Sequence, residues 1–363
     1  MNTIIQIGLI CVLLCAVASR SSGRPADRDL ATHVDPMVGT KNMGHTFPGA
    51  TVPFGMVQLS PDTRQPQMYD AEGKYTGEAY PYCSGYQWDD NTIFGFSHTH
   101  FSGTGHSDLG DISLMAASGP LNLEPGDPVI KGSGFHSRFR HDTEIAEPGY
   151  YRVTLDDHDI DVELTATTRV GMHRLTFAPG SETRVVLDMM ANIYQFDGKN
   201  VWTFLRVEND TLVTGSRQTT GWARTRTVYF AISFSRPFVD YGHKKYDDIP
   251  YRGFYRRFDE ERNFPEMAGR EIRAYFDFDD AGENPLLVKV ALSNVSTAGA
   301  LANMRAELPH WDFDRVRNES RAEWNEWLGK IDVRGGEEQT RVKFYTDLWH
   351  VLLGRHKIDD VSG

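Results

Sequence analysis

Short β-forming runs alternate with turn residues across residues 34–295, and this pattern limits the choice of fold more than any other feature of the chain. Residues 150–177, YYRVTLDDHDIDVELTATTRVGMHRLTF, contain runs that meet at Asp156-Asp157 and near Thr167-Thr168. No amphipathic segment of helical period lies between the runs, so the chain lacks the crossover helices that parallel strands need. The sequence therefore predicts a mainly β protein built on a large antiparallel β-sandwich, residues 30–296.

The hydrophobic pattern changes close to Ser296, from a period of about two to a period of about 3.6 residues. We expect one helix near residues 311–329, with Asp312 or a neighbour as its N-terminal cap. We expect a second helix near residues 337–354, whose apolar stripe consists of Val342, Tyr345, Leu348, Trp349, Leu352 and Leu353. The rest of the chain offers this stripe little surface to pack against, so we expect a truncated gene product that further helices would complete.

The N-terminus is typical of an export signal. Residues 1–18, MNTIIQIGLICVLLCAVA, carry no charge and end in Ala16-Val17-Ala18, a small-residue cleavage pattern. The apolar run is shorter than the roughly 18 to 20 residues of a membrane-spanning helix, although a short membrane anchor is the alternative. We expect an exported protein of the periplasm, cell surface or extracellular space, with no stable membrane span after cleavage. Only Cys83 of the 3 cysteines would then remain, so no intrachain disulfide could form.

Charge and motifs exclude several classes of function. The chain has 38 basic and 50 acidic residues, a net charge of −12, which disfavours nucleic acid as a partner. Its glycine-rich stretches lack the lysine of a phosphate-binding loop, and no GxSxG nucleophile elbow occurs. No two carboxylates form a convincing catalytic pair, since Glu319, Glu323 and Glu326 are best explained as the solvated face of a helix.

The candidate binding residues lie in two stretches, 34–63 and 82–115, where glycine and proline are mixed with histidine, tryptophan and aspartate. This composition is typical of shaped loops that approach a ligand closely. Trp88 lies among polar neighbours, Gln87, Asp89, Asp90 and Asn91, which favours an exposed indole that contacts a ligand. The alternative is an ordinary core tryptophan, with Asp89 and Asp90 serving only a turn.

Histidines are frequent in the second of these stretches. His98 and His100 would lie on one face of a strand, and together with His106, Asp108 and Asp111 they could form a metal cluster of a zinc hydrolase. The alternative, which we favour, is that the two histidines hydrogen-bond neighbouring loops or a sugar while the aspartates stabilise turns.

Six segments of the chain resemble the N-terminal domain of glycoside hydrolase family 92, in the same order along the sequence. They are residues 45–63 (HTFPGATVPFGMVQLSPDT), 82–86 (YCSGY), 95–105 (GFSHTHFSGTG), 110–115 (GDISLM), 139–155 (FRHDTEIAEPGYYRVTL) and 163–174 (ELTATTRVGMHR). The resemblance covers essentially the whole chain that would follow the signal peptide.

The resemblance implies a galactose-mutarotase-like supersandwich, a helical linker over residues 297–335 and the start of a truncated (α/α)6 barrel catalytic domain over residues 336–363. Family members release terminal mannose from α-mannosides, often on N-glycans or glycoproteins, with inversion of the anomeric carbon. They use a glutamic acid as proton donor, an aspartate as base and a calcium ion.

In the family, those carboxylates and most calcium ligands belong to the barrel, beyond the position of Gly363. The resemblance therefore implies no catalytic or metal-binding residue within this chain. For the sugar it favours Trp88, with Asp89, His98 and His100 as weaker candidates. A non-catalytic carbohydrate-binding or structural β-sandwich remains the alternative function.

Overall fold

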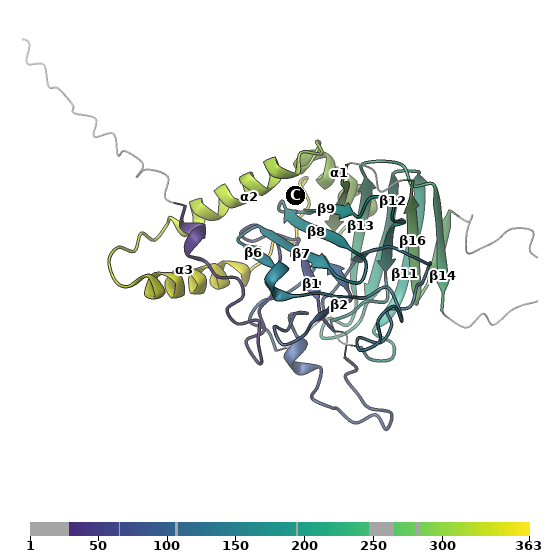
Figure 1. Cartoon of the computed structure of the whole chain (residues 1–363), viewed down its shortest axis with the longest axis horizontal. Helices are drawn as coiled ribbons and strands as arrows, with labels where there is room; N and C mark the ends of the chain where they lie inside the picture. The colour runs from purple at the N-terminus through teal and green to yellow at the C-terminus, as the bar shows by residue number, and fades with distance from the viewer. Residues whose placement is uncertain (1–28, 65, 106–107, 194, 247–264, 280–283) are drawn as a thin grey trace, which may run out of the picture.

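The computed structural model describes residues 29–363, except 65, 106–107, 194, 247–264 and 280–283 (Figure 1). The expected signal peptide and His106 lie outside the described residues. The described residues include three short 3₁₀ helices, η1 (Leu30–His33), η2 (Tyr80–Tyr82) and η3 (His141–Thr143). Among the described residues, no helix is long and apolar enough to cross a membrane.

The strands of the described part of the chain form two large antiparallel sheets and a two-stranded ribbon. The six-stranded sheet has the order β1 (Ser60–Asp62), β3 (Gly95–Ser97), β4 (Ser113–Ala117), β10 (Thr183–Asp188), β16 (Ile272–Phe278) and β14 (Asp240–Lys245). The nine-stranded sheet has the order β15 (Glu266–Gly269), β11 (Asn200–Asn209), β12 (Leu212–Thr219), β13 (Arg226–Phe234), β17 (Leu286–Ser293), β9 (Val170–Phe177), β8 (Ile160–Ala166), β7 (Tyr150–Leu155) and β6 (Ile145–Glu147). The ribbon pairs β2 (Thr92–Ile93) with β5 (Ser137–Arg138), so the predicted antiparallel fold is confirmed.

The main core lies between the two large sheets, and the two-residue side-chain period of the strands accounts for it. In β8, Ile160, Val162 and Leu164 are buried while Asp161 and Glu163 between them are half-buried. Strand β10 lies inside the smaller sheet, between β4 and β16, and is buried along its whole length. Each fully buried aliphatic side chain of this core contributes about 1.5 to 3 kcal/mol relative to an exposed one.

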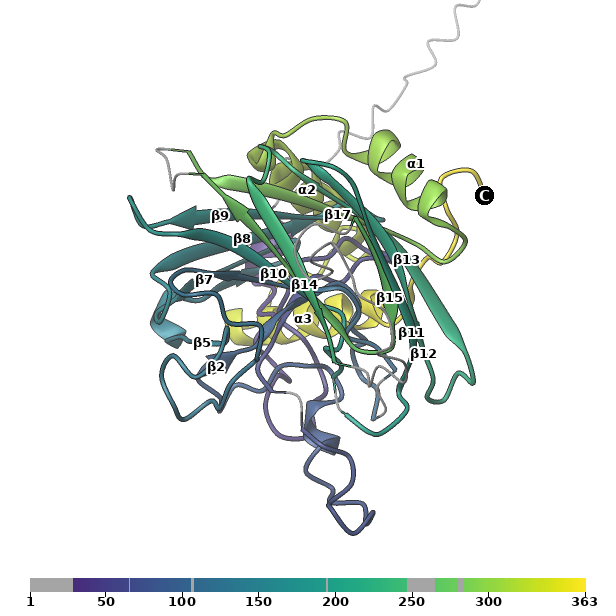
Figure 2. The ribbon, with the colours of Figure 1, turned by 90° about the vertical axis from the view of Figure 1, so that its right-hand side faces the viewer.

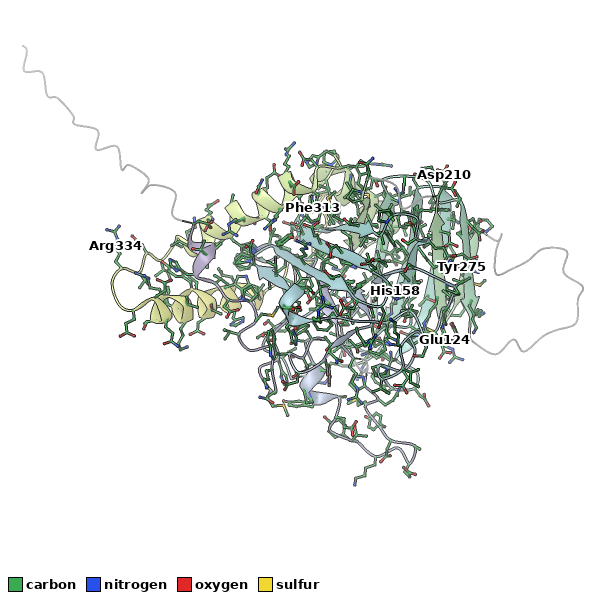
Figure 3. All side chains as sticks on the ribbon, in the orientation of Figure 1. Glu124, His158, Asp210, Tyr275, Phe313 and Arg334 are labelled. Atoms are coloured by element: carbon green, nitrogen blue, oxygen red, sulfur yellow. The ribbon has the colours of Figure 1, made fainter. Side chains whose placement is uncertain are left out.

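Two helices cover part of the outer face of the nine-stranded sheet. Helix α1 (Thr297–Glu307) begins at Ser296, whose side chain accepts a hydrogen bond from the Gly299 amide, and it packs on β17 and β13 (Figure 2). Helix α2 (Phe313–Leu328) begins at Asp312, which caps the Arg315 amide in the same way. Phe313, labelled in Figure 3, is buried where α2 begins over the sandwich.

Helix α3 (Glu338–Leu353) lies beside α2, and η1 contacts both helices (Figure 1). Helices α2 and α3 fall within the two ranges expected from the sequence, and Asp312 is the expected cap. Along the α3 stripe, Tyr345, Trp349 and Leu353 are buried against Trp324 and η1, while Leu348 and Leu352 remain half-buried. The sequence patterns did not single out α1 as a separate helix, because its apolar residues do not gather on one face.

Candidate functional site

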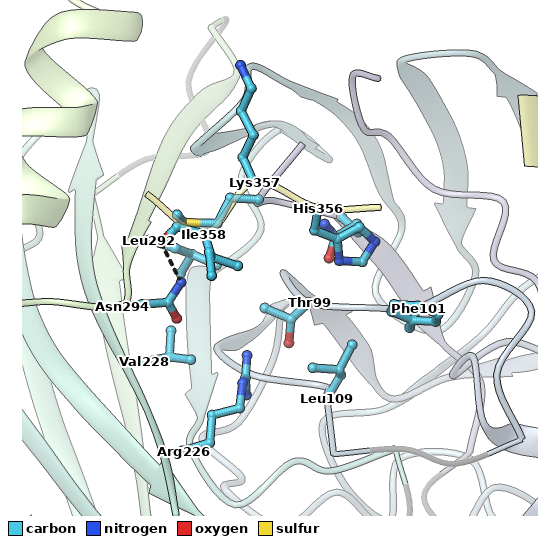
Figure 4. Close-up of a pocket in the computed structure, with 12 residues that line it drawn as sticks. Thr99, Phe101, Leu109, Arg226, Val228, Leu292, Asn294, His356, Lys357 and Ile358 are labelled. Carbon is cyan, nitrogen blue, oxygen red and sulfur yellow. Dashed lines mark hydrogen bonds between the residues drawn. The ribbon is translucent and has the colours of Figure 1, made fainter. Parts of the chain in front are cut away.

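A pocket lies between Thr99, Phe101 and Leu109, the ends of β13 and β17, and residues 356–358 (Figure 4). Its volume is about 160 Å³. We call it the Arg226 pocket, and it is lined by Met56, Gln58, Thr99, Phe101, Leu109, Arg226, Val228, Leu292, Asn294, His356, Lys357 and Ile358. Arg226 and Leu109 approach it from one side, opposite His356 and Lys357 (Figure 4).

The C-terminal segment forms one wall of the pocket because it is anchored on the sandwich. The Asn294 side-chain amide donates to the Ile358 carbonyl at 3.2 Å, and the Lys357 amide donates to the Phe54 carbonyl at 2.9 Å. Further along, the buried Asp360 carboxylate accepts hydrogen bonds of 2.8 Å from Ser293 and Asn303. These contacts join segments that are far apart in the sequence into one rigid rim.

A buried ion-pair cluster underlies the pocket. Arg226 Nη1 lies 2.5 Å from Asp111 Oδ2, and Arg217 Nη1 lies 3.4 Å from Asp111 Oδ1. The Thr99 hydroxyl donates to the same carboxylate at 2.6 Å. Burial raises the pKa of Asp111, but the two guanidinium charges and the Thr99 bond outweigh it and leave the pKa below its ordinary value. Asp111 therefore stays ionised and holds Arg226 in place at the pocket wall.

His356 forms part of the opposite wall. Its Nε2 lies 2.9 Å from the Leu353 carbonyl, which can only accept, so Nε2 carries the proton and Nδ1 is the acceptor nitrogen. The ring packs against Phe101 with centroids 5.1 Å apart. Burial lowers the pKa of His356, the Leu353 bond opposes this, and the nearby charges of Arg226 and His100 lower it further. The imidazole is therefore neutral near pH 7.

The lining side chains suit a neutral polyhydroxylated molecule. Hydroxyl, amide and guanidinium groups of Thr99, Asn294 and Arg226 stand beside the apolar surfaces of Phe101 and Leu109. Such a mixture is usual in small-molecule sites. No aspartate or glutamate lines the pocket, so its lining offers no carboxylate to act as a base.

The structure places His98 and His100 in the interior, with 0% of either side chain exposed. His98 Nδ1 donates to the Ile112 carbonyl at 2.6 Å, and its Nε2 lies 3.0 Å from His173 Nε2. His100 Nδ1 donates to the Gln58 carbonyl at 2.8 Å, and its Nε2 lies 3.0 Å from Asp62 Oδ1. Both histidines thus hydrogen-bond neighbouring segments behind the pocket and do not line it.

Trp88 and Asp89 lie on another loop, outside the Arg226 pocket. The Trp88 indole is half-buried, packs against the main core and stacks on His141. The exposed Asp89 carboxylate pairs with Lys41 at 2.6 Å. The four sequence-predicted sugar-binding residues are therefore divided between the interior and the loop of residues 87–91, and their role in sugar binding stays a prediction.

Gly363, the last residue of the sequence, is exposed and does not line the Arg226 pocket. Its amide donates to the Asp360 carbonyl at 3.0 Å, which closes a turn beyond the anchored segment. The proton donor, the base and the calcium ligands expected beyond Gly363 would belong to residues that this sequence does not include. Their assignment to the barrel therefore stays a prediction.

The described residues do not fit a calcium site by themselves. Calcium takes about six to eight oxygen ligands, usually including carboxylates. The pocket offers no carboxylate, and the Asp111 carboxylate beside Arg226 is occupied by two arginines and Thr99. Throughout the described part of the chain, no group of three or more His, Cys, Asp or Glu side chains could hold a metal ion. The zinc cluster considered from the sequence includes His106, which lies outside the described residues.

Sequence reasoning missed two residues of this pocket, Arg226 itself and His356. Arg226 and His356 belong to no recognisable motif, and only the packing of β13 against residues 99–111 brings Arg226 beside Asp111.

Two family descriptions match the chain. Residues 33–293 match "Glycosyl hydrolase family 92 N-terminal domain", and residues 299–363 match "Glycosyl hydrolase family 92 catalytic domain". A relative from Arthroderma benhamiae, described as an uncharacterized secreted glycosidase, is 25% identical over an alignment of 353 residues, and the match covers 90% of this chain and 40% of the relative.

Solved structures agree with these matches. A family GH92 alpha-mannosidase from Bacteroides thetaiotaomicron, in complex with mannoimidazole, is 34% identical with a TM-score of 0.81, and the match covers 93% of this chain and 41% of that protein. A family GH92 inverting mannosidase from Bacteroides thetaiotaomicron VPI-5482 is 25% identical with a TM-score of 0.71, covering 89% and 39%. The chain thus spans about two fifths of the length of these relatives.

Proposed function

Because the chain belongs to glycosyl hydrolase family 92, we propose that it is the N-terminal part of an exported α-mannosidase that releases terminal mannose from α-mannosides. Its natural partners would be mannose-containing N-glycans or glycoproteins. The observation that carries the proposal is the 34% identity, over 93% of the chain, to an alpha-mannosidase solved with mannoimidazole.

In this proposal, sugar binding and catalysis belong to different parts of the enzyme, and the catalytic part is not included in this sequence. An inverting glycosidase needs two carboxyl groups about 6.5 to 9.5 Å apart, with room for a water molecule between them. The Arg226 pocket has no carboxylate, and Asp111 behind it is held as an ion pair. We therefore assign sugar binding to this chain, and proton donor, base and calcium ligands to residues beyond Gly363.

The test of this division is an activity assay of the chain by itself. The purified chain, incubated with an aryl α-mannoside or a high-mannose glycan plus calcium, should release no mannose above the blank. Saturation-transfer NMR with methyl α-mannoside should still detect binding, whereas methyl β-galactoside serves as the control sugar. Turnover that persists through purification and disappears on mutating a carboxylate of residues 29–363 would contradict the proposal, and so would equal binding of both sugars.

Export is proposed from the N-terminal pattern and from the secreted relative. N-terminal sequencing of the protein recovered outside the cytoplasm should begin at Ser19. A mature protein that retains residues 1–18 in the membrane fraction would favour the short anchor.

A non-catalytic carbohydrate-binding sandwich is the second candidate, and the carboxylate-free pocket favours it. Sequencing the gene beyond codon 363 separates the two functions. A reading frame that continues into a helical catalytic domain supports the mannosidase, and a stop codon supports the binding module.

A further inference from the structure

Three aromatic side chains lie on the outer face of the nine-stranded sheet, on the side opposite the main core. Trp202 and Phe204 belong to β11, and Tyr229 belongs to β13. Leu205 and Val228, which adjoin them in sequence, point to the other side and belong to the main core. Trp202 is 50% exposed, and the other two rings are half-buried. We call these three residues the aromatic face.

The register of the strands places the three rings in two neighbouring rows. Phe204 pairs with Ser216 of β12, which in turn pairs with Tyr229 of β13. Adjacent strands are about 4.8 Å apart, so the positions of Phe204 and Tyr229 are about 10 Å apart, with only a serine between them. Trp202 lies two residues from Phe204 on the same strand, about 7 Å along it. An extended ligand of a few linked rings can therefore contact all three residues.

Uncharged polar side chains separate the rings. In the second row Trp202 pairs with Gln218, whose side-chain amide donates to the Thr227 hydroxyl at 3.3 Å. Beyond this row, the hairpin of residues 220–225 joins β12 to β13. Amide and hydroxyl groups both donate and accept hydrogen bonds, as a hydroxyl-rich ligand requires. Aromatic rings beside such groups suit the apolar face and the hydroxyls of a sugar.

The aromatic face carries no charge of its own, although the chain as a whole has a net charge of −12. The two rows that contain it consist of uncharged residues. Beside Phe204, the Arg206 guanidinium is paired with the Glu266 carboxylate at 2.6 Å. Among these described residues a basic partner finds no carboxylate without a counter-charge, and a polyanion is repelled by the chain as a whole. The charge pattern therefore favours a neutral partner.

Helix α1 covers a different part of the same outer face. It packs on β13 at Ala231, which shares a hydrophobic cluster with Ala300 and Met304 of the helix (Figure 2). Two residues earlier on this strand Tyr229 stays partly exposed, and Trp202 is exposed further still. Several aromatic side chains left exposed together on one sheet are typical of an interaction surface.

We propose that the aromatic face is a second glycan-binding surface, which holds an extended neutral mannose chain outside the Arg226 pocket. Tyr229 and Val228 are adjacent on opposite sides of β13, and Val228 lines the pocket. A glycan branch on the aromatic face therefore leaves the pocket open to another branch. Two sites on one chain raise the affinity for a polymer above that for a single sugar unit, because the second contact is intramolecular. The inference rests on the proposed function, since mannose-containing glycans supply the partner.

Affinity electrophoresis of the 363-residue chain in gels that contain soluble α-mannan tests this surface. The wild-type chain should be retarded by α-mannan and not by dextran, a glucose polymer. Trp202→Ala and Tyr229→Ala should each weaken binding of α-mannan by about fivefold to tenfold, because each removes one aromatic contact. Trp202→Phe, which keeps a ring, should retain part of the affinity. Saturation-transfer NMR with methyl α-mannoside should show unchanged binding by all three variants.

Tyr75→Ala is the matched control, because Tyr75 is 46% exposed on a loop outside both large sheets. It should leave the affinity for α-mannan unchanged. Equal α-mannan affinities of wild type and Trp202→Ala, or equal retardation by the two polymers, would overturn the surface. A wild-type dimer that Trp202→Ala dissociates in sedimentation would also overturn it, since a second copy would then occupy the aromatic face.

Binding of methyl α-mannoside by the wild-type chain separates this inference from the proposed function. A chain that binds methyl α-mannoside but loses no α-mannan affinity on Trp202→Ala keeps the proposed function and refutes the aromatic face. A chain that binds neither ligand refutes both. If Tyr229→Ala fails to fold, Trp202→Ala decides by itself, because its position is 50% exposed.

Discussion

The rings of Trp88 and His141 stack face to face, with centroids 3.9 Å apart and an angle of 11° between their planes. Phe139 packs edge-on against the other side of this pair, 5.2 Å from the His141 ring. His141 Nδ1 lies 2.5 Å from the Glu144 carboxylate, which fixes the imidazole in its plane. One face of the indole is therefore covered by a side chain 53 residues further along the sequence.

The stack should be measurable as a coupling between Trp88 and His141. A double-mutant cycle of Trp88→Ala and His141→Ala, followed by denaturant unfolding, should give a coupling free energy of about 0.5 to 1.5 kcal/mol, as for other aromatic pairs. Strictly additive losses would show that the stack contributes nothing to stability. Trp222→Ala, on the exposed hairpin, is the control that should change the free energy of unfolding little.

Trp88 is also expected to affect turnover in an enzyme that contains both this chain and its catalytic domain. Trp88→Ala should lower kcat/KM for an α-mannoside by at least about tenfold, or about 1.4 kcal/mol of transition-state stabilisation. His141→Ala, which removes the stack and keeps the indole, should have a smaller effect. Loss of stability with normal specific activity in the folded fraction would instead assign Trp88 a purely structural role.

Asp111 and Asp89 offer a matched pair of aspartates in opposite environments. Asp111→Asn should lower the free energy of unfolding by about 3 to 5 kcal/mol, because it leaves the fully buried Arg217 without its counter-charge. Asp89→Asn removes an exposed ion pair with Lys41 and should cost less than about 1 kcal/mol. Urea denaturation at pH 7 checks both values. Similar effects of the two substitutions would contradict the buried cluster as described.

The buried His98–His173 pair predicts loss of stability in acid. Burial lowers the pKa of His98 from its ordinary value of 6.5 to about 3, opposed by the Ile112 bond and aided by the His100 charge. Burial likewise lowers the pKa of His173 well below 6.5, with the His98 charge adding to it. Below pH 6.5 the unfolded chain therefore binds more protons than the folded chain.

The contribution of this pair to stability should accordingly be constant above about pH 7 and fall as the pH drops below 6.5 towards 3, by up to about 1.4 kcal/mol per pH unit for each histidine. His98→Asn, which keeps a donor for the Ile112 carbonyl, should flatten this slope. His310→Asn, on a half-buried histidine before α2, should leave the slope unchanged. A steep slope that survives His98→Asn would assign the acid sensitivity to other groups.

Alanine substitutions at Gly85 and Gly73 should distinguish the cost of a steric clash from the cost of backbone strain alone. Both have positive φ angles, 84° and 78°, but a Cβ at position 85 would lie 2.3 Å from Asp62 Oδ1, whereas one at position 73 would meet nothing within 4 Å. Gly73→Ala should therefore cost only about 1 to 2 kcal/mol of backbone strain. Gly85→Ala should cost clearly more in the same thermal unfolding experiment. Equal losses would show that the loop around Gly85 adapts freely.

Local sequence patterns determined the secondary-structure elements of this protein. The change of hydrophobic period near Ser296 predicted the sandwich and the positions of α2 and α3, because side-chain period depends on the local backbone geometry. The motifs in residues 82–105 predicted closely packed loops, and Gly85 beside Asp62 confirms this.

Only the tertiary structure decided which of these segments meet. A strand's alternation shows that one of its faces is buried, but it does not identify the strand or loop that covers that face. For this reason the sequence suggested His98 and His100 as binding residues, whereas in the structure both side chains are buried and hydrogen-bond backbone carbonyls. Arg226 and His356, with no local signal, came to line the pocket because long-range packing between sheets and the C-terminal segment brought them together.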